Sequence, residues 1–164
     1  MESGHAAALT LRDARPQEAA MLSALAFRSK AHWGYPQDFM QACRGELTYA
    51  EADVARGGFV VAEAGGRIVG FTALAAGADG AVAVEALFVE PREIGRGIGR
   101  ALIDHAKRRA ARLGARRLVI QGDPHAEGFY LKAGARHAGA RPSGSIPGRM
   151  LPVFAIELAS EKSG

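Results

Sequence analysis

The chain has 164 residues, of which 48% are hydrophobic and 23% are charged, as is usual for a single globular domain. The 21 basic residues outnumber the 17 acidic ones and give a net charge of +4, which suits a small polyanionic ligand. Nucleic acid ranks below such a ligand, because no aromatic residues are interleaved with the arginines to stack on bases. The single cysteine, Cys43, cannot form an internal disulfide. Because the chain shows neither a leader nor a run long enough to cross a membrane, we expect a cytoplasmic protein without a membrane partner.

In chain order, the pattern first predicts a tail, a half-buried strand and three helices, at 1–7, 8–14, 16–30, 37–43 and 48–57. Pro16 suits the first turn of the first helix. Met21 begins the apolar face of that helix, which then continues at helical spacing. Thr48 and Glu51 are spaced as a capping box for the third helix, which ends at Gly57.

Three strands are expected next, at 59–64, 67–76 and 81–90. The pair Gly65–Gly66 is a two-residue hairpin signal between the first two of these strands, and the GADG segment at 77–80 makes a second tight connection. Short connections of this kind join antiparallel neighbours. We therefore expect an antiparallel meander in the middle of the chain.

The last third of the chain alternates helices and strands, at 98–113, 116–121, 125–132, 134–141 and 150–158. Leu113 completes the apolar face of the first of these helices, and Gly114 ends it. The order of elements predicts one α/β domain with a mixed central sheet of about seven strands and helices on both faces.

The segment that joins the fourth expected strand to the fourth helix contains Gly95, Gly97 and Gly99, flanked by Arg96 and Arg100. Glycines let the backbone turn tightly with its N–H groups inward, and the unpaired N–H groups of a helix start add a positive dipole end. The pattern favours a phosphate or pyrophosphate site, although a plain connecting turn is the other interpretation.

Two better-known phosphate loops do not fit this segment. A P-loop ends in Gly-Lys-Ser/Thr, whereas here Gly99 is followed by Arg100 and Ala101. A Rossmann fingerprint needs a third glycine at the position of Arg100. Asp123, which follows the strand at 116–121, keeps a dinucleotide site as a weaker alternative.

A second motif lies in the helix expected at 125–132. Ala126, Phe129, Tyr130 and Ala133 are spaced to face the core from one side of this helix. Tyr130 is therefore either a core aromatic residue whose hydroxyl is satisfied by a neighbour or a functional residue.

The two motifs in this order resemble the GNAT superfamily of acyl-CoA-dependent N-acetyltransferases. The resemblance rests on a GxGxG turn after LFVEP and an AxxFYxKxGA helix about thirty residues later, and it covers roughly residues 60–136. SKAHWGY and PSGSIPGR are more loosely similar to segments of a bacterial subgroup of that family. The resemblance implies a GNAT-like domain over 8–160, followed by a tail at 161–164, with a sheet that splays open after its fourth strand.

The resemblance also implies that acetyl-CoA is the acetyl donor. Leu87, Phe88 and Val89 would pair through their backbone with the pantetheine arm, and Val89 would mark the point where the sheet opens. The other implied cofactor residues are Gly95, Arg96, Gly97, Ile98, Gly99, Arg100, Asp123, Phe129 and Tyr130.

Two positions depart from the family's usual pattern. Ile94 stands where members usually have Arg or Gln, and Asp123 stands where many have Asn. A carboxylate at position 123 would repel a phosphate unless it faces away or accepts hydrogen bonds.

Acetyl transfer to an amine requires a proton acceptor and help for the leaving thiolate. Removing the proton of an alkyl ammonium with a pKa near ~10.4 costs roughly 4–5 kcal/mol at neutral pH. Glu85 is the first candidate for this base, because in a regular strand it lies on the same face as Leu87. His32, His125 and His137 are the alternatives. Tyr130 is expected to hydrogen-bond the thiolate sulfur.

The remaining site expectations concern the acyl oxygen and the acceptor. The backbone N–H of Val89 would polarise the thioester carbonyl as an oxyanion-type donor. Trp33 and Tyr35 lie in a loop rich in aromatic residues and are candidates for acceptor binding. We expect no metal.

These observations predict an N-acetyltransferase that acts on the amine of a small molecule or peptide in a ternary complex. The alternatives are a non-catalytic acyl-CoA-binding module of the same fold and an unrelated nucleotide-binding protein. Members of the family are often dimers through their final strands, so a homodimer is one partner to test for.

Overall fold

The computed structural model describes residues 8–158, so the tails expected at 1–7 and 161–164 lie outside the described residues. The strands are β1 (Leu9–Asp13), β2 (Phe59–Ala64), β3 (Arg67–Ala76), β4 (Ala81–Val89), β5 (Arg117–Gln121), β6 (Arg136–Pro142) and β7 (Met150–Glu157). The helices are α1 (Ala19–Ala31), α2 (Gln37–Cys43), α3 (Glu51–Ala55), α4 (Ile98–Arg112) and α5 (Glu127–Lys132). Short 3₁₀ turns lie at Pro16–Glu18, Pro91–Glu93 and Pro124–Ala126.

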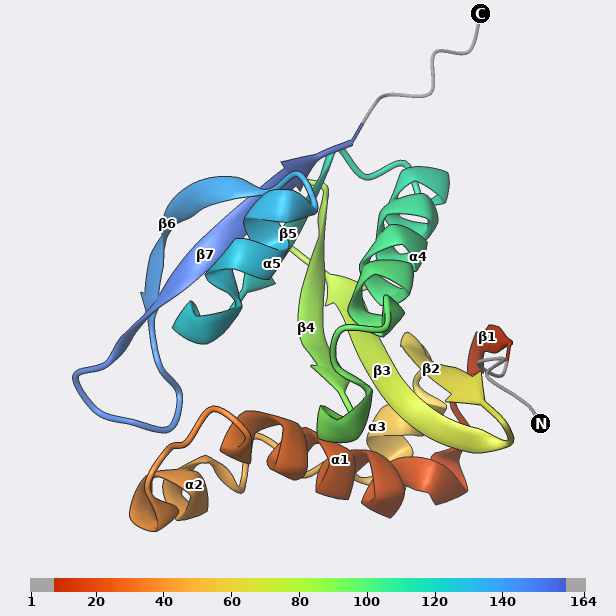
Figure 1. The fold of residues 1–164 in the computed structure, drawn as a ribbon. Coiled ribbons are helices and arrows are strands. Elements are labelled where there is room, and N and C mark those ends of the chain that lie inside the picture. Colours follow the sequence, from red (N-terminus) through yellow and green to blue (C-terminus); the bar gives the residue numbers. More distant parts are fainter. Residues whose placement is uncertain (1–7, 159–164) are drawn as a thin grey trace, which may run out of the picture.

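The strands form one sheet in the order β1-β2-β3-β4-β5-β7-β6. Neighbouring strands are antiparallel except for β4 and β5, which are parallel. One apolar cluster joins α1, α2 and α3 to one face of the sheet, and a second joins α4 and α5 to the other (Figure 1). The expected mixed sheet with helices on both faces is therefore confirmed.

Several local expectations are wrong. Thr48 does not cap α3, because its hydroxyl donates a hydrogen bond to the Arg44 carbonyl of the preceding turn at 2.7 Å. The helix begins instead at Glu51, and the Asp53 carboxylate accepts a hydrogen bond from the Ala50 N–H at 2.8 Å. Leu113 is 68% exposed, because it lies at the end of α4 and Ile103 fills the core in the middle of the helix.

Met21, which was expected on the apolar face of α1, is also exposed. The buried positions of this helix are Ala19, Leu22, Leu25 and Ala26. Their spacing is helical, so the helical period is confirmed. The buried face is narrower than expected, because it does not include Met21.

A β-bulge lies in the middle of β4. Ala86 pairs with Ala73 of β3 and Val84 pairs with Leu74, so Glu85 is an extra residue without a partner across the ladder. The bulge shifts the alternation of the strand by one residue. Val84 and Leu87 consequently both contact the core on the α4 and α5 side of the sheet, and the expected regular strand geometry around Glu85 is wrong.

The bulge coincides with the end of the parallel β4–β5 ladder. The last residue of β4 that pairs with β5 is Val84, opposite Ile120. Beyond it, Glu85 is unpaired and residues 86–89 pair only with β3. The sheet therefore opens from Glu85 onward, earlier in the strand than Val89, and it leaves one edge of β4 free.

Within residues 8–158, no helix is both long and apolar enough to cross a membrane.

Close packing of α4 on β3 makes Gly70 sensitive to substitution. A Cβ atom at this position would lie 3.0 Å from Ile98 Cγ2 and 3.0 Å from the Phe88 carbonyl oxygen. We expect Gly70→Ala to lower the free energy of unfolding by about 1–3 kcal/mol through overpacking. The same change at Gly128 in α5, where a Cβ would meet nothing within 4 Å, should be neutral or stabilising by about 0.5–1 kcal/mol. Urea unfolding of both variants would measure this, and equal effects would contradict the packing explanation.

Candidate active site

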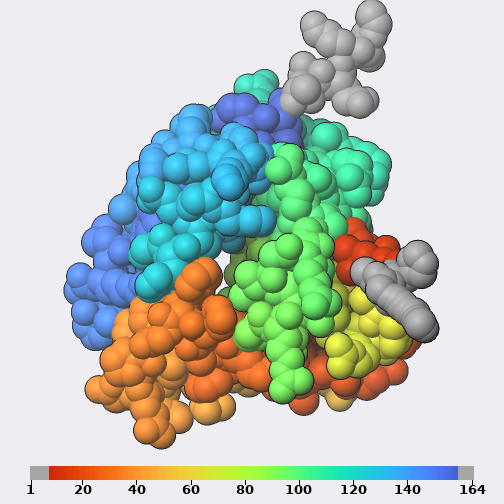
Figure 2. Space-filling view, viewed as in Figure 1, coloured from red at the N-terminus to blue at the C-terminus, as the bar shows by residue number. Residues whose placement is uncertain are grey.

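A cavity of ≈ 1050 Å³ occupies the opening between β4 and β5. Figure 2 shows the surface hollowed where the orange, green and cyan parts of the chain meet. The wall is built by the end of α1, the open part of β4, the glycine loop, the end of β5, the start of α5 and the β6–β7 segment. The predicted site residues in this wall are Trp33, Glu85, Leu87, Phe88, Val89, Gly95, Gly97, Ile98, Gly99, Arg100, Asp123, Phe129 and Tyr130.

The glycine loop lies at one end of the cavity. Gly95 and Gly97 have φ values of 90° and 82°, which side chains other than glycine rarely adopt. Gly97 is the residue before the first turn of α4, and the N–H groups from Gly95 to Arg100 have no backbone acceptor within residues 8–158. Several unpaired donors therefore converge at the positive end of a 15-residue helix, which is the geometry of an anion site.

Gly99 is needed for a different reason. A Cβ atom there would lie 3.1 Å from the Phe129 ring, so this glycine lets the start of α4 approach α5. The arginines beside the glycines are engaged elsewhere. Arg96 pairs with Glu93 at 3.3 Å and does not line the cavity, while Arg100 lines it and contacts Asp104 at 3.2 Å.

Tyr130 forms part of the cavity wall between the glycine loop and the end of β5. Its side chain is 6% exposed and packs against Phe129 and Phe154, with ring centroids 5.1 and 5.3 Å away. Gly122 makes room for the ring, because a Cβ at this position would lie 2.8 Å from it. The hydroxyl makes no hydrogen bond within the described part of the chain. Burial, with a smaller effect of the Asp123 charge, raises the pKa of Tyr130.

Glu85 lies at the bulge of β4 and is exposed along the cavity wall. It makes no hydrogen bond or ion pair with other residues between 8 and 158. Tyr49 lines the same cavity, and its pKa is raised by burial and then by the charges of Glu46 and Glu85. The carboxylates of Glu46 and Glu85 thus both raise the pKa of Tyr49 in this part of the cavity wall.

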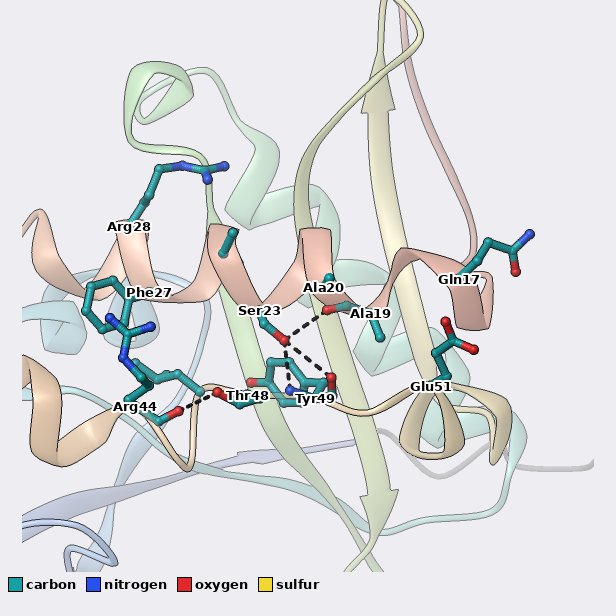
Figure 3. A pocket seen from close by; sticks show the side chains of 12 residues that line it. Gln17, Ala19, Ala20, Ser23, Phe27, Arg28, Arg44, Thr48, Tyr49 and Glu51 are labelled. Atoms are coloured by element: carbon teal, nitrogen blue, oxygen red, sulfur yellow. Dashed lines mark hydrogen bonds between the residues drawn. The ribbon is translucent and has the colours of Figure 1, made fainter.

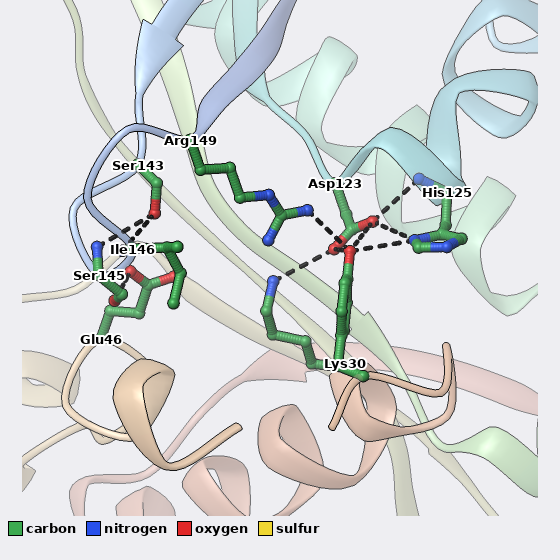
Figure 4. Close-up of polar contacts among 9 residues, drawn as sticks. Lys30, Glu46, Asp123, His125, Ser143, Ser145, Ile146 and Arg149 are labelled. Carbon is green, nitrogen blue, oxygen red and sulfur yellow. Dashed lines mark hydrogen bonds and ion pairs between the residues drawn. The ribbon is translucent and has the colours of Figure 1, made fainter. Parts of the chain in front are cut away.

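A polar network around Asp123 forms another part of the cavity wall (Figure 4). The carboxylate accepts hydrogen bonds from Lys30 Nζ at 3.2 Å, from the Tyr35 hydroxyl at 2.8 and 2.9 Å, and from the His125 backbone N–H at 2.9 Å. Arg149 donates to the Tyr35 hydroxyl at 2.8 Å. We call these five residues the Asp123 network, and it joins the end of α1, the end of β5 and the segment before β7.

The Asp123 network explains how a carboxylate is accommodated here. Burial by itself raises the pKa of Asp123, but the His125 N–H, the Tyr35 hydroxyl, the His125 ring and the Lys30 charge together lower it below its ordinary value. Burial and the hydrogen bond to Asp123 raise the pKa of Tyr35, against a smaller opposing effect of Arg149. The Asp123 carboxylate accepts several hydrogen bonds, which is one of the two conditions under which it would not repel a phosphate.

The two expected acceptor residues have different positions. Trp33 lines the cavity and stacks on His125, with ring centroids 5.1 Å apart and an angle of 11°. Tyr35 does not line the cavity, and its hydroxyl donates a hydrogen bond to the Asp123 carboxylate. Their roles in binding stay predictions.

Sequence reasoning missed Lys30 and Glu46. Lys30 is part of SKAHWGY, but nothing in that segment says that it meets residue 123. Glu46 accepts a hydrogen bond from the Ser145 hydroxyl, across the same loop that carries Arg149. Both contacts link segments about a hundred residues apart, so no local pattern could have found them.

A second, shallower hollow of ≈ 610 Å³ lies between α1 and the segment 44–51 (Figure 3). Small side chains such as Ala20 and Ala24 line it, and the Ser23 hydroxyl accepts a hydrogen bond from the Tyr49 N–H at 2.8 Å. No predicted site residue lies in this hollow.

The chain matches the profile of the acetyltransferase (GNAT) family over residues 23–135. Among solved structures it is similar to a GCN5-related N-acetyltransferase from Rhodopseudomonas palustris, with a TM-score of 0.76 and 24% identity over 96% of this chain and 100% of that one. It is also similar to the PaiA N-acetyltransferase of Thermoplasma acidophilum in complex with coenzyme A, with a TM-score of 0.74 and 17% identity over 92% and 99% of the two chains.

A third similar structure is N-acetylglutamate synthase from Neisseria gonorrhoeae, complexed with coenzyme A and N-acetyl-glutamate. Its TM-score is 0.67 at 18% identity, over 93% of this chain and 36% of that one. At these identities the solved structures show a shared fold. No curated protein sequence matches the chain closely enough to count as a relative.

Because Asp123 is ionised in the folded chain, part of the free energy of unfolding depends on pH. Because its pKa in the folded chain is below the ordinary value near ~3.9, its contribution is present above about pH 5 and is lost as the pH falls through 3.9 towards the folded pKa. We expect Asp123→Asn to be less stable than the parent at neutral pH, and the difference to shrink in acid. Urea unfolding between pH 3 and 7 measures this, with the exposed Asp79→Asn as control. A difference that does not change with pH would contradict the assignment.

Proposed function

Because the chain belongs to the acetyltransferase (GNAT) family, we propose that it transfers an acetyl group directly from acetyl-CoA to the primary amine of a small molecule or peptide within a ternary complex. Acetyl-CoA is the donor that the family uses, and two of the similar structures hold coenzyme A. The observation that carries the proposal is the cavity itself, which has unpaired N–H groups at one end and the side chain of Tyr130, a mostly buried residue, in its wall.

The donor side suits a long ligand that ends in a pyrophosphate. The glycine loop would hold the pyrophosphate through the N–H groups of Gly95 to Arg100. The free edge of residues 85–89 offers backbone groups for pairing with the amides of the pantetheine arm, in the way a peptide adds to a sheet edge. The N–H of Val89 remains the proposed donor to the thioester carbonyl oxygen.

Tyr130 suits the departure of the thiolate. A thiol has an ordinary pKa near ~8.5, and the pKa of Tyr130 is raised above its own ordinary value of ~10. The phenol therefore stays protonated at neutral pH and resists giving its proton away completely. We propose that it stabilises the leaving sulfur by donating a hydrogen bond.

The acceptor side is the end of the cavity next to Trp33, Tyr49 and Glu85. A neutral amine nitrogen must attack the thioester, so the ammonium form has to lose a proton to a group in this wall. Glu85 remains a candidate, since it lines the cavity.

The non-catalytic alternative depended on Ile94 and Asp123. The carboxylate of Asp123 is bound by the Asp123 network, so its presence gives no sign of a lost donor site. The side chain of Ile94 is exposed. The N–H groups of the glycines that follow it have no acceptor within residues 8–158, so they are available to a phosphate. We therefore favour the enzyme.

Acetyl-CoA should raise the thermal midpoint of unfolding, whereas ATP and NAD at equal concentration should not. Ligand at a hundred times its dissociation constant stabilises by about 2.7 kcal/mol, or roughly 5–10 °C for a domain of this size. Gly97→Ala should reduce the shift, because Gly97 is left-handed at the start of α4.

Gly114→Ala is the matched control for that variant. Gly114 has the same φ of 82° at the other end of α4, and a Cβ at either position would meet nothing within 4 Å. Both variants carry the same backbone strain, so only a loss specific to Gly97 supports the donor site. A shift with ATP or NAD alone would overturn the proposal.

Tyr130→Phe should lower kcat at least about tenfold without changing the dissociation constant of acetyl-CoA. The phenyl ring keeps the packing against Phe129 and Phe154, and the lost hydroxyl has no hydrogen-bond partner within residues 8–158. The free energy of unfolding should therefore be almost unchanged. Turnover equal to that of the parent enzyme would remove Tyr130 from the mechanism.

A further inference from the structure

The ring of His125 is held in one orientation by two oxygen atoms. His125 Nδ1 lies 2.9 Å from Asp123 Oδ1 and 3.0 Å from the Tyr35 hydroxyl oxygen. One face of the ring stacks on Trp33. Stacking on Trp33 fixes the plane of the imidazole. The contacts of Nδ1 with Asp123 and Tyr35 fix the rotation of the ring within that plane, and Figure 4 shows the contact with Asp123.

Counting hydrogens assigns the tautomer of this ring. The ionised carboxylate of Asp123 only accepts hydrogen bonds, and the Tyr35 hydroxyl, which already accepts one from Arg149, has a single hydrogen to donate to Asp123. If Nδ1 were unprotonated, its lone pair would face the carboxylate oxygen at 2.9 Å with no hydrogen between them. Nδ1 must therefore carry a proton, and in the neutral ring Nε2 carries the lone pair.

The lone pair of Nε2 is available to a ligand. His125 lines the cavity and its side chain is 45% exposed, and Nε2 makes no hydrogen bond with any other residue between 8 and 158. The other histidines considered as bases, His32 and His137, do not line the cavity. His125 is therefore the histidine whose free nitrogen belongs to the site.

Glu85 also lines the cavity, but no neighbouring group orients it. Its carboxylate lacks a hydrogen-bond or ion-pair partner in the described chain, whereas the His125 ring has three neighbours that hold it. An oriented base whose second nitrogen is bonded to a carboxylate has the geometry of a nucleophile-activating histidine, because the carboxylate stabilises the imidazolium that forms.

We propose that His125 is the catalytic base that takes the proton from the acceptor ammonium, and that Asp123 is the residue that positions it. This assignment rests on the proposed function. The N–H bond of the ammonium breaks and the proton goes to His125 Nε2. The free amine then attacks the thioester carbon, the C–S bond breaks, and the thiolate takes a proton from the new amide nitrogen. His125 returns its proton to solvent.

Two charged or titratable groups, Asp123 and Tyr35, contact the ring, and two cations, Lys30 and Arg149, lie behind them. Asp123, from the end of β5, favours the imidazolium. Lys30, from α1, and Arg149, from the segment before β7, disfavour it, and each is in turn bound to Asp123 or Tyr35. Tyr35 stays neutral because its pKa is raised by burial and by Asp123. Among residues 8–158, the anion in contact with the ring is therefore the one that orients it.

The decisive measurement is kcat/KM against pH for the parent enzyme and three Gln variants, at positions 125, 85 and 137. His125→Gln should lose at least about a hundredfold in kcat/KM and lose its acid limb, while still binding acetyl-CoA like the parent. Glu85→Gln should keep that limb, because in this mechanism the proton goes to His125 and Glu85 takes no part in the transfer. His137→Gln, an exposed histidine outside the cavity, is the matched control and should keep parental activity.

Two further measurements separate a catalytic role from a structural one. Imidazole added to His125→Ala should restore activity, which a purely structural defect would not allow. Nitrogen NMR of the free protein should show His125 with the proton on Nδ1, and this holds whether or not an acceptor is known. A proton on Nε2 would overturn the proposal, as would a pH profile of His125→Gln equal to that of the parent. Absence of turnover by the parent enzyme with every amine tried would instead overturn the proposed function.

Discussion

The site depends on one feature of the sheet, which is the end of the parallel β4–β5 ladder at Val84. Two strands that pair over only four residues and then separate leave a wedge that side chains do not fill. The bulge at Glu85 occurs at the same point, and it turns Leu87 towards the α4 side of the sheet. The free strand edge, the cavity and the changed side-chain alternation of β4 thus all begin at the same position in the strand.

The two sides of the cavity are stabilised in different ways. On the donor side, glycines and an unpaired helix start present backbone N–H groups, which require no side-chain ordering when they bind an anion. On the acceptor side, Lys30, Arg149 and the Tyr35 hydroxyl surround the single carboxylate of Asp123. A partly buried charge is tolerated only when its partners are this well placed. The same contacts hold together three segments distant in sequence, so they rigidify this part of the cavity wall.

Most of the fold was predictable because its signals are local. Glycine pairs, alternating strands and helical spacing located every strand and helix of residues 8–158 to within a few positions. The errors arise because tertiary context overrides the local pattern. Thr48 was assigned to the helix that follows it, but its hydroxyl bonds the turn that precedes it. Leu113 matches the period of α4, but the helix has passed beyond the sheet at that point.

The sequence by itself determined the family, the order of elements and the glycine loop, because those properties depend on residues that are close along the chain. It also named Tyr130, which a short motif places on its helix. Only the tertiary structure decided that Asp123 meets Lys30 and Tyr35, that the sheet opens at Glu85 rather than at Val89, and that the ring of His125 is bonded through Nδ1. The first depends on contacts between residues about ninety positions apart, and the second on a register shift between strands. The third joins residues two positions apart, but Tyr35 and Trp33, from a distant segment, fix the ring orientation. None of these leaves a local pattern in the sequence.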